Sequence, residues 1–461
     1  MKRFLLLLGL LWAIYLYMVA PEPYSLYSCY SCFFLFIVAF VILFKERCRY
    51  NLICFEFVFS LVFFFTNYAY PLFCYPIIPH FSLFTLEFPE EYINSGCALA
   101  TIGYIAFCLG CLKYKVLDQI MDIGTFTRKF RVHSWYKPVT NVLSLLLIFS
   151  LIPILLSGVY DGNWGEGAIY KVLADIFIFY IIFVELIKSN SLKQFFSKNA
   201  FFILLVLCYI VEITMIGNRG FMLRIALLSV LLYTNFYRKI RPIYLILCMM
   251  GGMFLLFFVG KVRGGGDFSG FVDNDMPPIL QMGQDLIINN RSLYVLMEYR
   301  DKFGVNFGQT WLMNILSIIP FAQSIFLKIT GLKELDISSA ALVTDLYFRE
   351  NNEDVFGLGT NLIGDIYICG GLLGVVFFMY LLGSFLSKVY MKGQRGDMFY
   401  WFIYAMMFMD SIILTRSTYL TSIRPIMWGL ALYYFAKKRI VYKEEKKEKG
   451  EEKVEEESLV L

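Results

Sequence analysis

Unbroken apolar runs of about twenty residues recur along almost the whole chain, and they constrain its fold more than any other feature. A helix of that length crosses the hydrocarbon layer of a membrane, where the backbone must satisfy its own hydrogen bonds. Because the runs are continuous rather than alternating, an outer-membrane barrel is excluded. Only 17% of the residues are charged, against about a quarter in soluble domains, so a soluble enzyme is excluded too. The runs lie near 4–20, 24–44, 51–70, 92–112, 138–157, 168–187, 199–216, 220–236, 242–260, 361–386, 398–415 and 418–436.

These runs predict an all-α polytopic membrane protein with about twelve transmembrane helices. Its sidedness follows from Lys and Arg, which gather in the connections on the cytoplasmic side. With the N-terminus inside, the inner segments hold most of the 41 basic residues, including Lys45, Arg47 and Arg49. The short outer connections hold almost none. We therefore expect both termini to be cytoplasmic.

The expected organisation has four parts. Residues 1–260 form a transmembrane bundle with spans one to nine, 261–360 a large extracytoplasmic loop, 361–436 spans ten to twelve, and 437–461 a charged cytoplasmic tail. A loop of this length is usually functional. Within it, residues 284–300 have helical apolar spacing and predict an interfacial helix lying on the membrane. Residues 311–330 predict a re-entrant or surface-lying amphipathic helix, since a thirteenth span there would place the basic tail outside.

Basic residues on the expected outer side run against the usual charge bias and need a reason. Each one alone could be a lipid-headgroup contact or a structural ion pair. As a set they favour an anion site, because a guanidinium fits phosphate oxygens two at a time. Arg219 lies in a glycine-flanked turn and Arg263 precedes three glycines, so exposed backbone N–H groups accompany both charges. The predicted pyrophosphate-binding residues are Arg219, Lys261, Arg263, Arg291, Arg416 and Arg424.

Carboxylates are the other chemical resource of the sequence. Asp365 lies just inside the predicted tenth span, where a charge is costly, and is a candidate general base or the partner of a nearby arginine. Four further acids lie within apolar runs, namely Glu56, Asp175, Glu212 and Asp410. They form a proton path or are the counter-ions of Arg224, Arg416 and Arg424. Neither a phosphate-binding glycine loop nor a persuasive metal motif is present, so we expect no cofactor, no metal and no nucleic-acid partner.

Four short segments together resemble the Wzy-type polymerases of lipid-linked oligosaccharide repeat units. The segments are GNRGFMLR at 217–224, KVRGGG at 261–266, FGLGTNLIGDIYICGGLLGVV at 356–376 and LTRSTYL at 414–420. The resemblance implies a metal-independent glycosyltransferase with a GT-C-like fold at the outer face of the bacterial inner membrane. There a growing glycan would pass from its polyprenyl pyrophosphate to a new lipid-linked unit. The product would be a surface polysaccharide such as O-antigen, capsule or exopolysaccharide.

By matching position, the resemblance gives pyrophosphate-holding roles to Arg219, Arg263 and Arg416, and the predicted catalytic residues are Arg219, Arg263 and Asp365. The expected partners are polyprenyl-pyrophosphate-linked oligosaccharides, membrane lipid, and the chain-length regulator and flippase of the same pathway. An O-antigen ligase is an alternative, but the expected loop 261–360 has no His. A lipid-linked oligosaccharide flippase is a second alternative that would not need so long an outer loop. A membrane acyltransferase is a more distant one, weakened by the presence of only two His in the chain.

Overall fold

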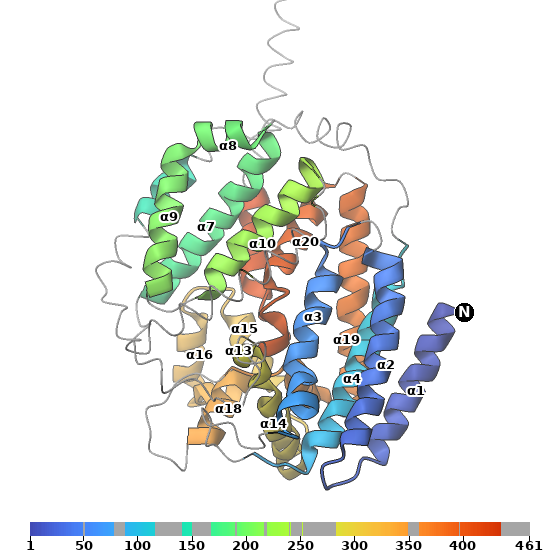
Figure 1. Cartoon of the computed structure of the whole chain (residues 1–461). Coiled ribbons are helices and arrows are strands. Elements are labelled where there is room, and N and C mark those ends of the chain that lie inside the picture. The colour runs from blue at the N-terminus through green and yellow to red at the C-terminus, as the bar shows by residue number, and fades with distance from the viewer. Residues whose placement is uncertain are drawn as a thin grey trace, which may run out of the picture. The chain divides into compact units, whose positions relative to one another are not determined.

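A computed structural model describes residues 1–48, 51–77, 88–115, 141–149, 167–189, 191–215, 219–238, 240, 251, 283–348, 359–395 and 397–434 (Figure 1). Every regular element within these residues is a helix, which confirms the predicted all-α class. The longer elements are α1 (Lys2–Met18), α2 (Leu26–Leu43), α3 (Phe55–Asn67), α4 (Tyr92–Cys111), α7 (Gly167–Lys188), α9 (Ala200–Met215), α10 (Arg219–Phe236), α14 (Asn289–Phe303), α18 (Ser339–Phe348), α19 (Leu362–Gln394) and α20 (Met398–Asp410). The shorter ones are η1 (Phe44–Cys48), η2 (Tyr70–Cys74), α8 (Leu192–Lys198), α13 (Gln284–Ile287), η4 (Gln309–Trp311), α15 (Leu312–Leu316), α16 (Ala322–Thr330), α17 (Glu334–Ile337) and η5 (Leu414–Arg416).

The chain folds into two compact units, each assembled from separate stretches of sequence. Unit 1 contains Met1–Asp118, Ile240–Met391 and Met407–Arg424, and unit 2 contains Gln119–Lys239, Lys392–Met406 and Pro425–Leu461. The boundaries expected at residues 261, 361 and 437 remain predictions. In unit 2, α10 packs against α7 and α9, and the Tyr209 hydroxyl donates to Asp175 Oδ1 at 2.6 Å.

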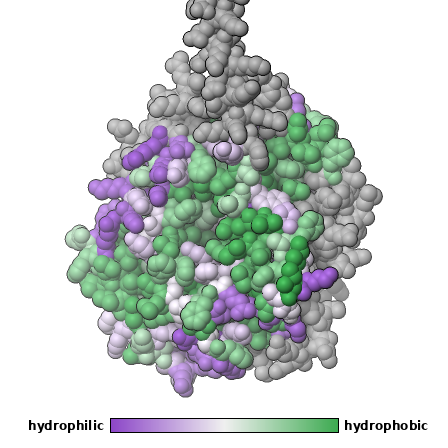
Figure 2. All heavy atoms as spheres, turned by 180° about the vertical axis from the view of Figure 1, so that it is seen from behind, coloured by the Kyte–Doolittle hydropathy of each residue, from purple (hydrophilic) through white to green (hydrophobic). Residues whose placement is uncertain are grey.

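Helix α4 forms the centre of unit 1, and nearly all of its side chains are buried. Helices α1 and α2 both pack against it, as Figure 1 shows. The outward sides of α1 and α2 remain apolar, with exposed residues such as Leu11 and Phe34. Figure 2 shows a broad field of hydrophobic side chains on the face that it displays. Apolar residues on both sides of a helix are typical of a bundle surrounded by lipid.

Three described helical segments are long and apolar enough to cross a membrane, namely Leu26–Cys48, Tyr92–Cys111 and Leu362–Gln394. A fourth crossing results if α8 and the first part of α9, which meet at a bend of 86°, form one broken span. The first three coincide with the runs predicted at 24–44, 92–112 and 361–386. The described helices are therefore compatible with a membrane protein, whereas the full set of twelve spans remains a prediction.

Glycines bring the backbones of α4 and α19 into direct contact. A Cβ atom added at Gly110 would collide with the Tyr380 carbonyl oxygen and lie 2.8 Å from the Ser384 nitrogen. One added at Gly383 would collide with the Phe107 carbonyl oxygen in the same way. Small residues permit such close helix packing in membranes, where van der Waals contact replaces the hydrophobic effect as the attraction between helices.

Helix α19 is interrupted near its start. Gly371 has a φ of 60° and a ψ of −158°, which no helix accommodates. The break leaves the Ile368 carbonyl available to the backbone N–H of Asn306, which donates to it at 2.9 Å. Asn306 thus supplies the hydrogen bond that the helix does not give to the Ile368 carbonyl. Broken helices are tolerated within membranes when other parts of the protein satisfy the freed backbone groups in this way.

Helix α14 differs from the expected interfacial helix, because its first half lies inside the protein. All side chains from Asn289 to Met297 are buried. Tyr294 packs on Gly96 of α4, and Leu296 packs on Gly364 of α19. The helical apolar spacing of 284–300 therefore reflects burial against protein, and the prediction of a helix lying on the membrane was wrong for this half.

Residues 311–330 form no continuous span. They contribute to η4, α15 and α16, and Phe321, which precedes α16, has a φ of 65°. No residue of α15 or α16 is buried. Ile325 and Ile329 expose 56% and 79% of their surface. This exposed apolar face is compatible with the predicted re-entrant or surface-lying helix.

Candidate functional site

Polar side chains, all of them buried except that of Arg416, gather in unit 1 where α14 and α19 begin and where α3 and η5 end. We call this group the polar junction. Polar groups inside an apolar bundle are costly unless they bond to one another, and in membrane proteins they mark functional sites. The polar junction consists of Thr66, Asn67, Asn289, Asn290, Arg291, Thr360, Asn361, Asp365, Thr415 and Arg416.

Asn361 connects the polar junction to the start of α19. Its Oδ1 accepts the backbone N–H of Ile363 at 2.9 Å, which caps the helix. Its Nδ2 donates to Asn67 Oδ1 at 3.0 Å and to the Asn289 carbonyl at 3.3 Å. One fully buried side chain thus ties together α3, α14 and α19.

Arg416 reaches the polar junction through its backbone. The Thr360 N–H donates to the Arg416 carbonyl at 3.4 Å, and the Thr415 hydroxyl lies 3.0 Å from that of Thr66. Gly359 has a φ of 78°, and a Cβ added there would lie 2.9 Å from Asn289 Oδ1. Only glycine adopts this conformation without strain and fits so close to its neighbours. The Arg416 side chain is half-buried.

Asp365 is fully buried in the first turn of α19. Its Oδ2 accepts from Trp311 Nε1 and from the Tyr419 backbone N–H, both at 2.8 Å. Among the described residues, no ion pair joins Asp365 to an arginine, so its observed partners differ from the arginine suggested by the sequence. With both donors on Oδ2 and no exposed surface, this carboxyl group holds two aromatic residues in place. Its role as a general base remains a prediction.

The aromatic residues beside Asp365 form a cluster of three rings. Trp311 stacks on Tyr419 with centroids 5.3 Å apart and meets Phe378 edge-on at 4.8 Å. The Tyr419 hydroxyl donates to the Phe378 carbonyl at 3.0 Å. Trp311 and Tyr419 are half-buried, so neither residue is fully enclosed by protein. An aromatic face of this kind can pack on the apolar side of a sugar.

Arg291, a predicted pyrophosphate-binding residue, lies in the interior. Only 3% of its surface is exposed. Its guanidinium carbon lies 4.9 Å from the ring centroid of Phe88 and 5.2 Å from that of Tyr70. Cation–π attraction of this kind stabilises a desolvated charge. In this conformation Arg291 stabilises the packing around the polar junction and is not exposed to a lipid.

Arg300 forms a second polar group, at the break in α19. Its guanidinium lies over the ring of Tyr367, 5.0 Å from the centroid, and donates to Asp301 at 3.0 Å. The hydrogen bond to Asp301 raises the pKa of Arg300 above its ordinary value. The Tyr367 hydroxyl lies 2.8 Å from that of Tyr17 in α1. The cation–π contact joins α14 to α19, and the hydroxyl contact joins α19 to α1.

Hydrogen bonds link the segments that carry Arg291, Asp365 and Arg416, whereas their side chains have separate neighbours. Arg424 is half-buried and belongs to unit 1. Arg219 begins α10 in unit 2, and its side chain lies outside the described residues. Lys261 and Arg263 also lie outside them. Convergence of all six basic residues on one anion therefore remains a prediction.

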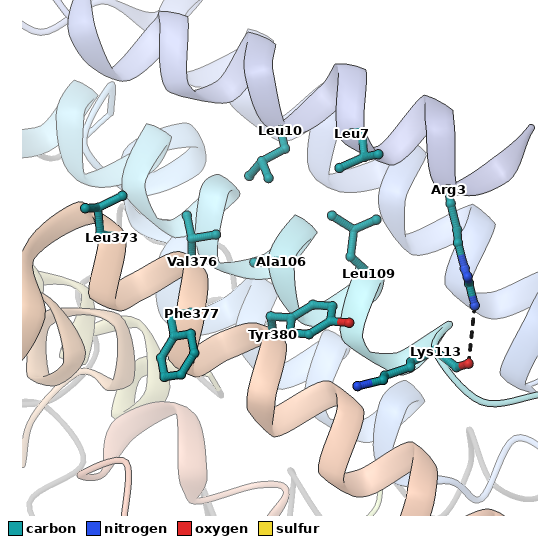
Figure 3. A pocket seen from close by; sticks show the side chains of 10 residues that line it. All are labelled: Arg3, Leu7, Leu10, Ala106, Leu109, Lys113, Leu373, Val376, Phe377 and Tyr380. Carbon is teal, nitrogen blue, oxygen red and sulfur yellow. Dashed lines mark hydrogen bonds between the residues drawn. The ribbon is translucent and has the colours of Figure 1, made fainter.

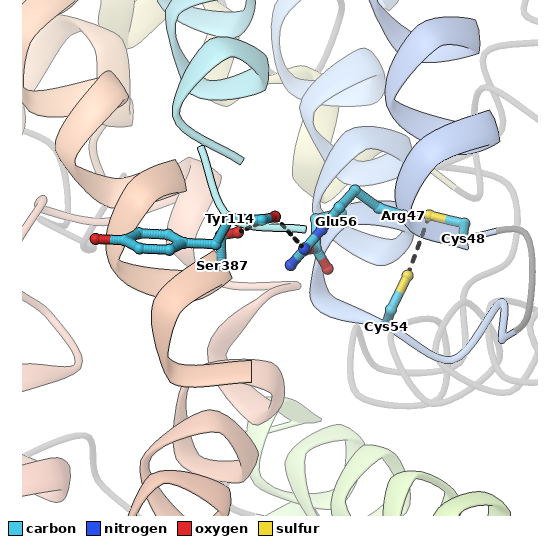
Figure 4. Close-up of polar contacts among 6 residues, drawn as sticks. All are labelled: Arg47, Cys48, Cys54, Glu56, Tyr114 and Ser387. Carbon is cyan, nitrogen blue, oxygen red and sulfur yellow. Dashed lines mark hydrogen bonds and ion pairs between the residues drawn. The ribbon is translucent and has the colours of Figure 1, made fainter. Parts of the chain in front are cut away.

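The intramembrane acid Glu56 has a different partner from those predicted. It accepts from Arg47 Nε at 2.9 Å and from Nη2 at 2.7 Å, and both side chains are buried (Figure 4). Arg47 also donates to the Tyr114 carbonyl at 3.4 Å. The prediction that Glu56 neutralises Arg224, Arg416 or Arg424 was wrong. Its partner is Arg47, which is buried in the π-helical turn η1. Asp175 accepts from Tyr209, Asp410 is buried, and the side chain of Glu212 lies outside the described residues.

The asparagines of the polar junction were missed from the sequence, although a signal was present. Short polar pairs stand beside apolar helices at Thr66–Asn67, Asn289–Asn290 and Thr360–Asn361. Uncharged polar pairs of this kind are also typical of ordinary helix ends, so one pair alone does not indicate a functional site. Their recurrence beside three helices that pack together is what distinguishes them, and only the fold reveals that packing.

No protein-family model, curated protein or solved structure matches the chain. The resemblance to the repeat-unit polymerases therefore rests on the short motifs, two of which include residues of the polar junction. These are the segments 356–376 and 414–420, which contain Asn361, Asp365 and Arg416.

Proposed function

We propose that the protein joins polyprenyl-pyrophosphate-linked oligosaccharide repeat units into a surface polysaccharide at the outer face of the bacterial inner membrane. The observation that carries the proposal is the polar junction, which links Arg291, Asp365 and Arg416 through hydrogen-bonded segments inside an apolar helical unit. The half-buried rings of Trp311 and Tyr419, held by Asp365, add a surface suited to a sugar.

The proposed architecture has about twelve spans, with both termini in the cytoplasm and residues 261–360 on the outer side. Under this arrangement the polar junction lies toward the outer ends of α4 and α19. Arg416 supplies charge at its edge, and the sequence alone assigns Arg219, Lys261 and Arg263 to pyrophosphate binding. Arg424 contributes from the segment that follows Arg416.

The reaction breaks the bond between the anomeric carbon of the growing glycan and its pyrophosphate. A hydroxyl oxygen of the incoming unit forms the new bond and gives its proton to a base. Negative charge develops on the departing pyrophosphate, and fixed guanidinium groups stabilise that charge without reorganisation. The activated bond comes with the lipid carrier, so no nucleotide sugar is needed. Asp365 acts here as a positioning residue through Trp311 and Tyr419.

Complementation of a strain lacking the gene tests the proposal. Arg416→Ala should lower long-chain glycan by about 10²-fold or more, because removal of one preorganised charge donor typically costs that much. Arg416→Lys should restore little, since an ammonium lacks the two-pronged geometry. Arg238→Ala, on an exposed residue after α10, is the matched control. Immunoblotting of each variant separates lost activity from lost protein.

The lipid-linked products of the deletion strain discriminate the alternatives. A polymerase defect leaves single repeat units on the outer face. Units trapped inside would instead assign a flippase, and long chains not attached to their final acceptor would assign a ligase. Either result, or normal glycan from Arg416→Ala at wild-type protein level, would remove the polymerase proposal.

Asp365 variants separate positioning from general-base catalysis. Asp365→Asn keeps an oxygen that accepts from Trp311 and Tyr419, so a positioning role predicts that long-chain glycan persists. Asp365→Ala removes the acceptor and should abolish polymer. Loss of polymer from both variants at normal protein level would favour a base.

A further inference from the structure

A cavity of about 570 Å³ lies between α1, α4 and α19 in unit 1 (Figure 3). Its wall is apolar along most of its length and ends in two cations. The lining residues are Arg3, Leu7, Leu10, Ala106, Leu109, Lys113, Leu373, Val376, Phe377 and Tyr380. None of these residues belongs to the polar junction.

The surface around the mouth of the cavity is apolar. Leu373 exposes 82% of its surface, Phe377 exposes 56% and Leu7 exposes 49%. Two of its walls, α4 and α19, are among the helices long and apolar enough to cross a membrane. A hollow in the side of such helices faces hydrocarbon, and the chains that fill it are those of lipids.

The cavity also has a direction. Arg3 lies in the first turn of α1 and Lys113 follows the end of α4, so both charges stand at the same end of the cavity. Arg3 donates through Nη2 to the carbonyls of Leu112 and Lys113, which fixes its guanidinium at the backbone that follows α4. The Lys113 Nζ lies 5.9 Å from the ring centroid of Tyr380, at the apolar wall.

The acid of the neighbouring surface ion pair does not neutralise Arg3 or Lys113. Lys2 is paired with Glu46, whereas no ion pair involves Arg3 or Lys113 within the part of the chain that the structure describes. From Arg3 to Leu10 the wall of α1 is about 10 Å long, at 1.5 Å per residue. That length holds part of one acyl chain, with its headgroup at the charged end.

We propose that this cavity binds an anionic phospholipid, with one acyl chain along α1, α4 and α19 and its phosphate at Arg3 and Lys113. The charges favour an anionic headgroup over a zwitterionic one, because each basic residue near a phosphate strengthens the attraction by a similar increment. The site is separate from the proposed glycan chemistry and holds whatever the fate of that proposal. On the predicted topology the bound lipid belongs to the cytoplasmic leaflet.

Native mass spectrometry of the full chain in detergent tests the site. The probe is palmitoyl-oleoyl phosphatidylglycerol, compared with phosphatidylcholine carrying the same chains. Wild-type protein should retain one phosphatidylglycerol in preference to phosphatidylcholine. Arg3→Gln or Lys113→Gln should weaken that binding about fivefold, and the double variant about thirtyfold. Lys115→Gln changes an exposed lysine outside the cavity and should bind as wild type does.

A second variant tests the apolar half without touching the charges. Leu10→Trp adds volume to the cavity and should displace the lipid while the protein remains monodisperse on size exclusion. Equal retention of the two lipids, or equal losses in Lys113→Gln and Lys115→Gln, would overturn the proposal. Preferential capture of a polyprenyl monophosphate from an equimolar mixture would overturn the assigned occupant.

Discussion

Glu56→Gln removes one charge from a pair that water does not reach. The side chains of Arg47 and Glu56 are 2% and 1% exposed, and the two hydrogen bonds between them both end on Glu56 Oε1. The guanidinium also contacts the Tyr114 carbonyl and the ring of Tyr390 at 5.5 Å. Because the pair joins η1 to α3 and to the segment after α4, its disruption should loosen three segments of unit 1 at once.

The expected loss is large because the arginine stays buried. Removal of one partner of a buried ion pair costs about 3–5 kcal/mol, most of it from the charge that is left without compensation. At about 2 °C per kcal/mol for a protein of this size, the unfolding midpoint should fall by about 6–10 °C. Arg47→Met combined with Glu56→Leu removes both charges and should recover most of that loss.

Thermal unfolding of the purified protein in detergent measures these shifts. The matched control is Glu46→Gln, which breaks the exposed pair with Lys2, whose side chains are 37% and 51% exposed. An exposed pair contributes about 0–1 kcal/mol, so the control should move the midpoint by about 2 °C at most. Equal shifts in Glu56→Gln and Glu46→Gln would refute the reasoning. So would a double variant that is less stable than Glu56→Gln.

Two further predictions concern packing. Gly110→Leu should abolish monodisperse protein on size exclusion, because the added side chain would collide with the backbone of α19 at Tyr380 and Ser384. The control Gly370→Ala, whose added Cβ meets nothing nearer than 3.9 Å, should behave as wild type. Aggregation of both variants would contradict this account. Asn361→Ala should lower the unfolding free energy by about 2–4 kcal/mol in thermal unfolding, the sum of a lost helix cap and unsatisfied buried polar groups. A loss no larger than that of an exposed cap, tested with Ser191→Ala at α8, would show that the contacts to Asn67 and Asn289 contribute nothing.

The apolar spans were the most predictable part of the fold. The run at 92–112 became α4 and the run at 361–386 became most of α19, because lipid leaves a long apolar segment no alternative to a helix. The break at Gly371 was not predictable. The break frees the Ile368 carbonyl, and the backbone N–H that donates to it belongs to Asn306, which lies far away in sequence.

The candidate site was predictable in part. Asp365 stood out because a carboxylate inside an apolar run needs a partner, and the structure supplies Trp311 and Tyr419 instead of an arginine. Sequence spacing does not reveal such partners, since these residues lie more than fifty positions away from Asp365 on either side. The same limit applies to Arg47. Its charge predicted a position in a cytoplasmic connection, whereas in the structure it lies in the π-helical turn η1 and is buried beside Glu56.

Helical apolar spacing has a different meaning in α14 and α16, and the glycines of the neighbouring helices account for the difference. Against α14, Gly96 and Gly364 leave space that Tyr294 and Leu296 fill, so its apolar face lies against protein. Helix α16 has no buried residue, and Ile325 and Ile329 remain exposed. In a membrane both arrangements satisfy the apolar side chains, because lipid and protein are about equally apolar. An amphipathic pattern therefore predicts the helix, whereas the small residues facing it determine whether protein or lipid covers its apolar side.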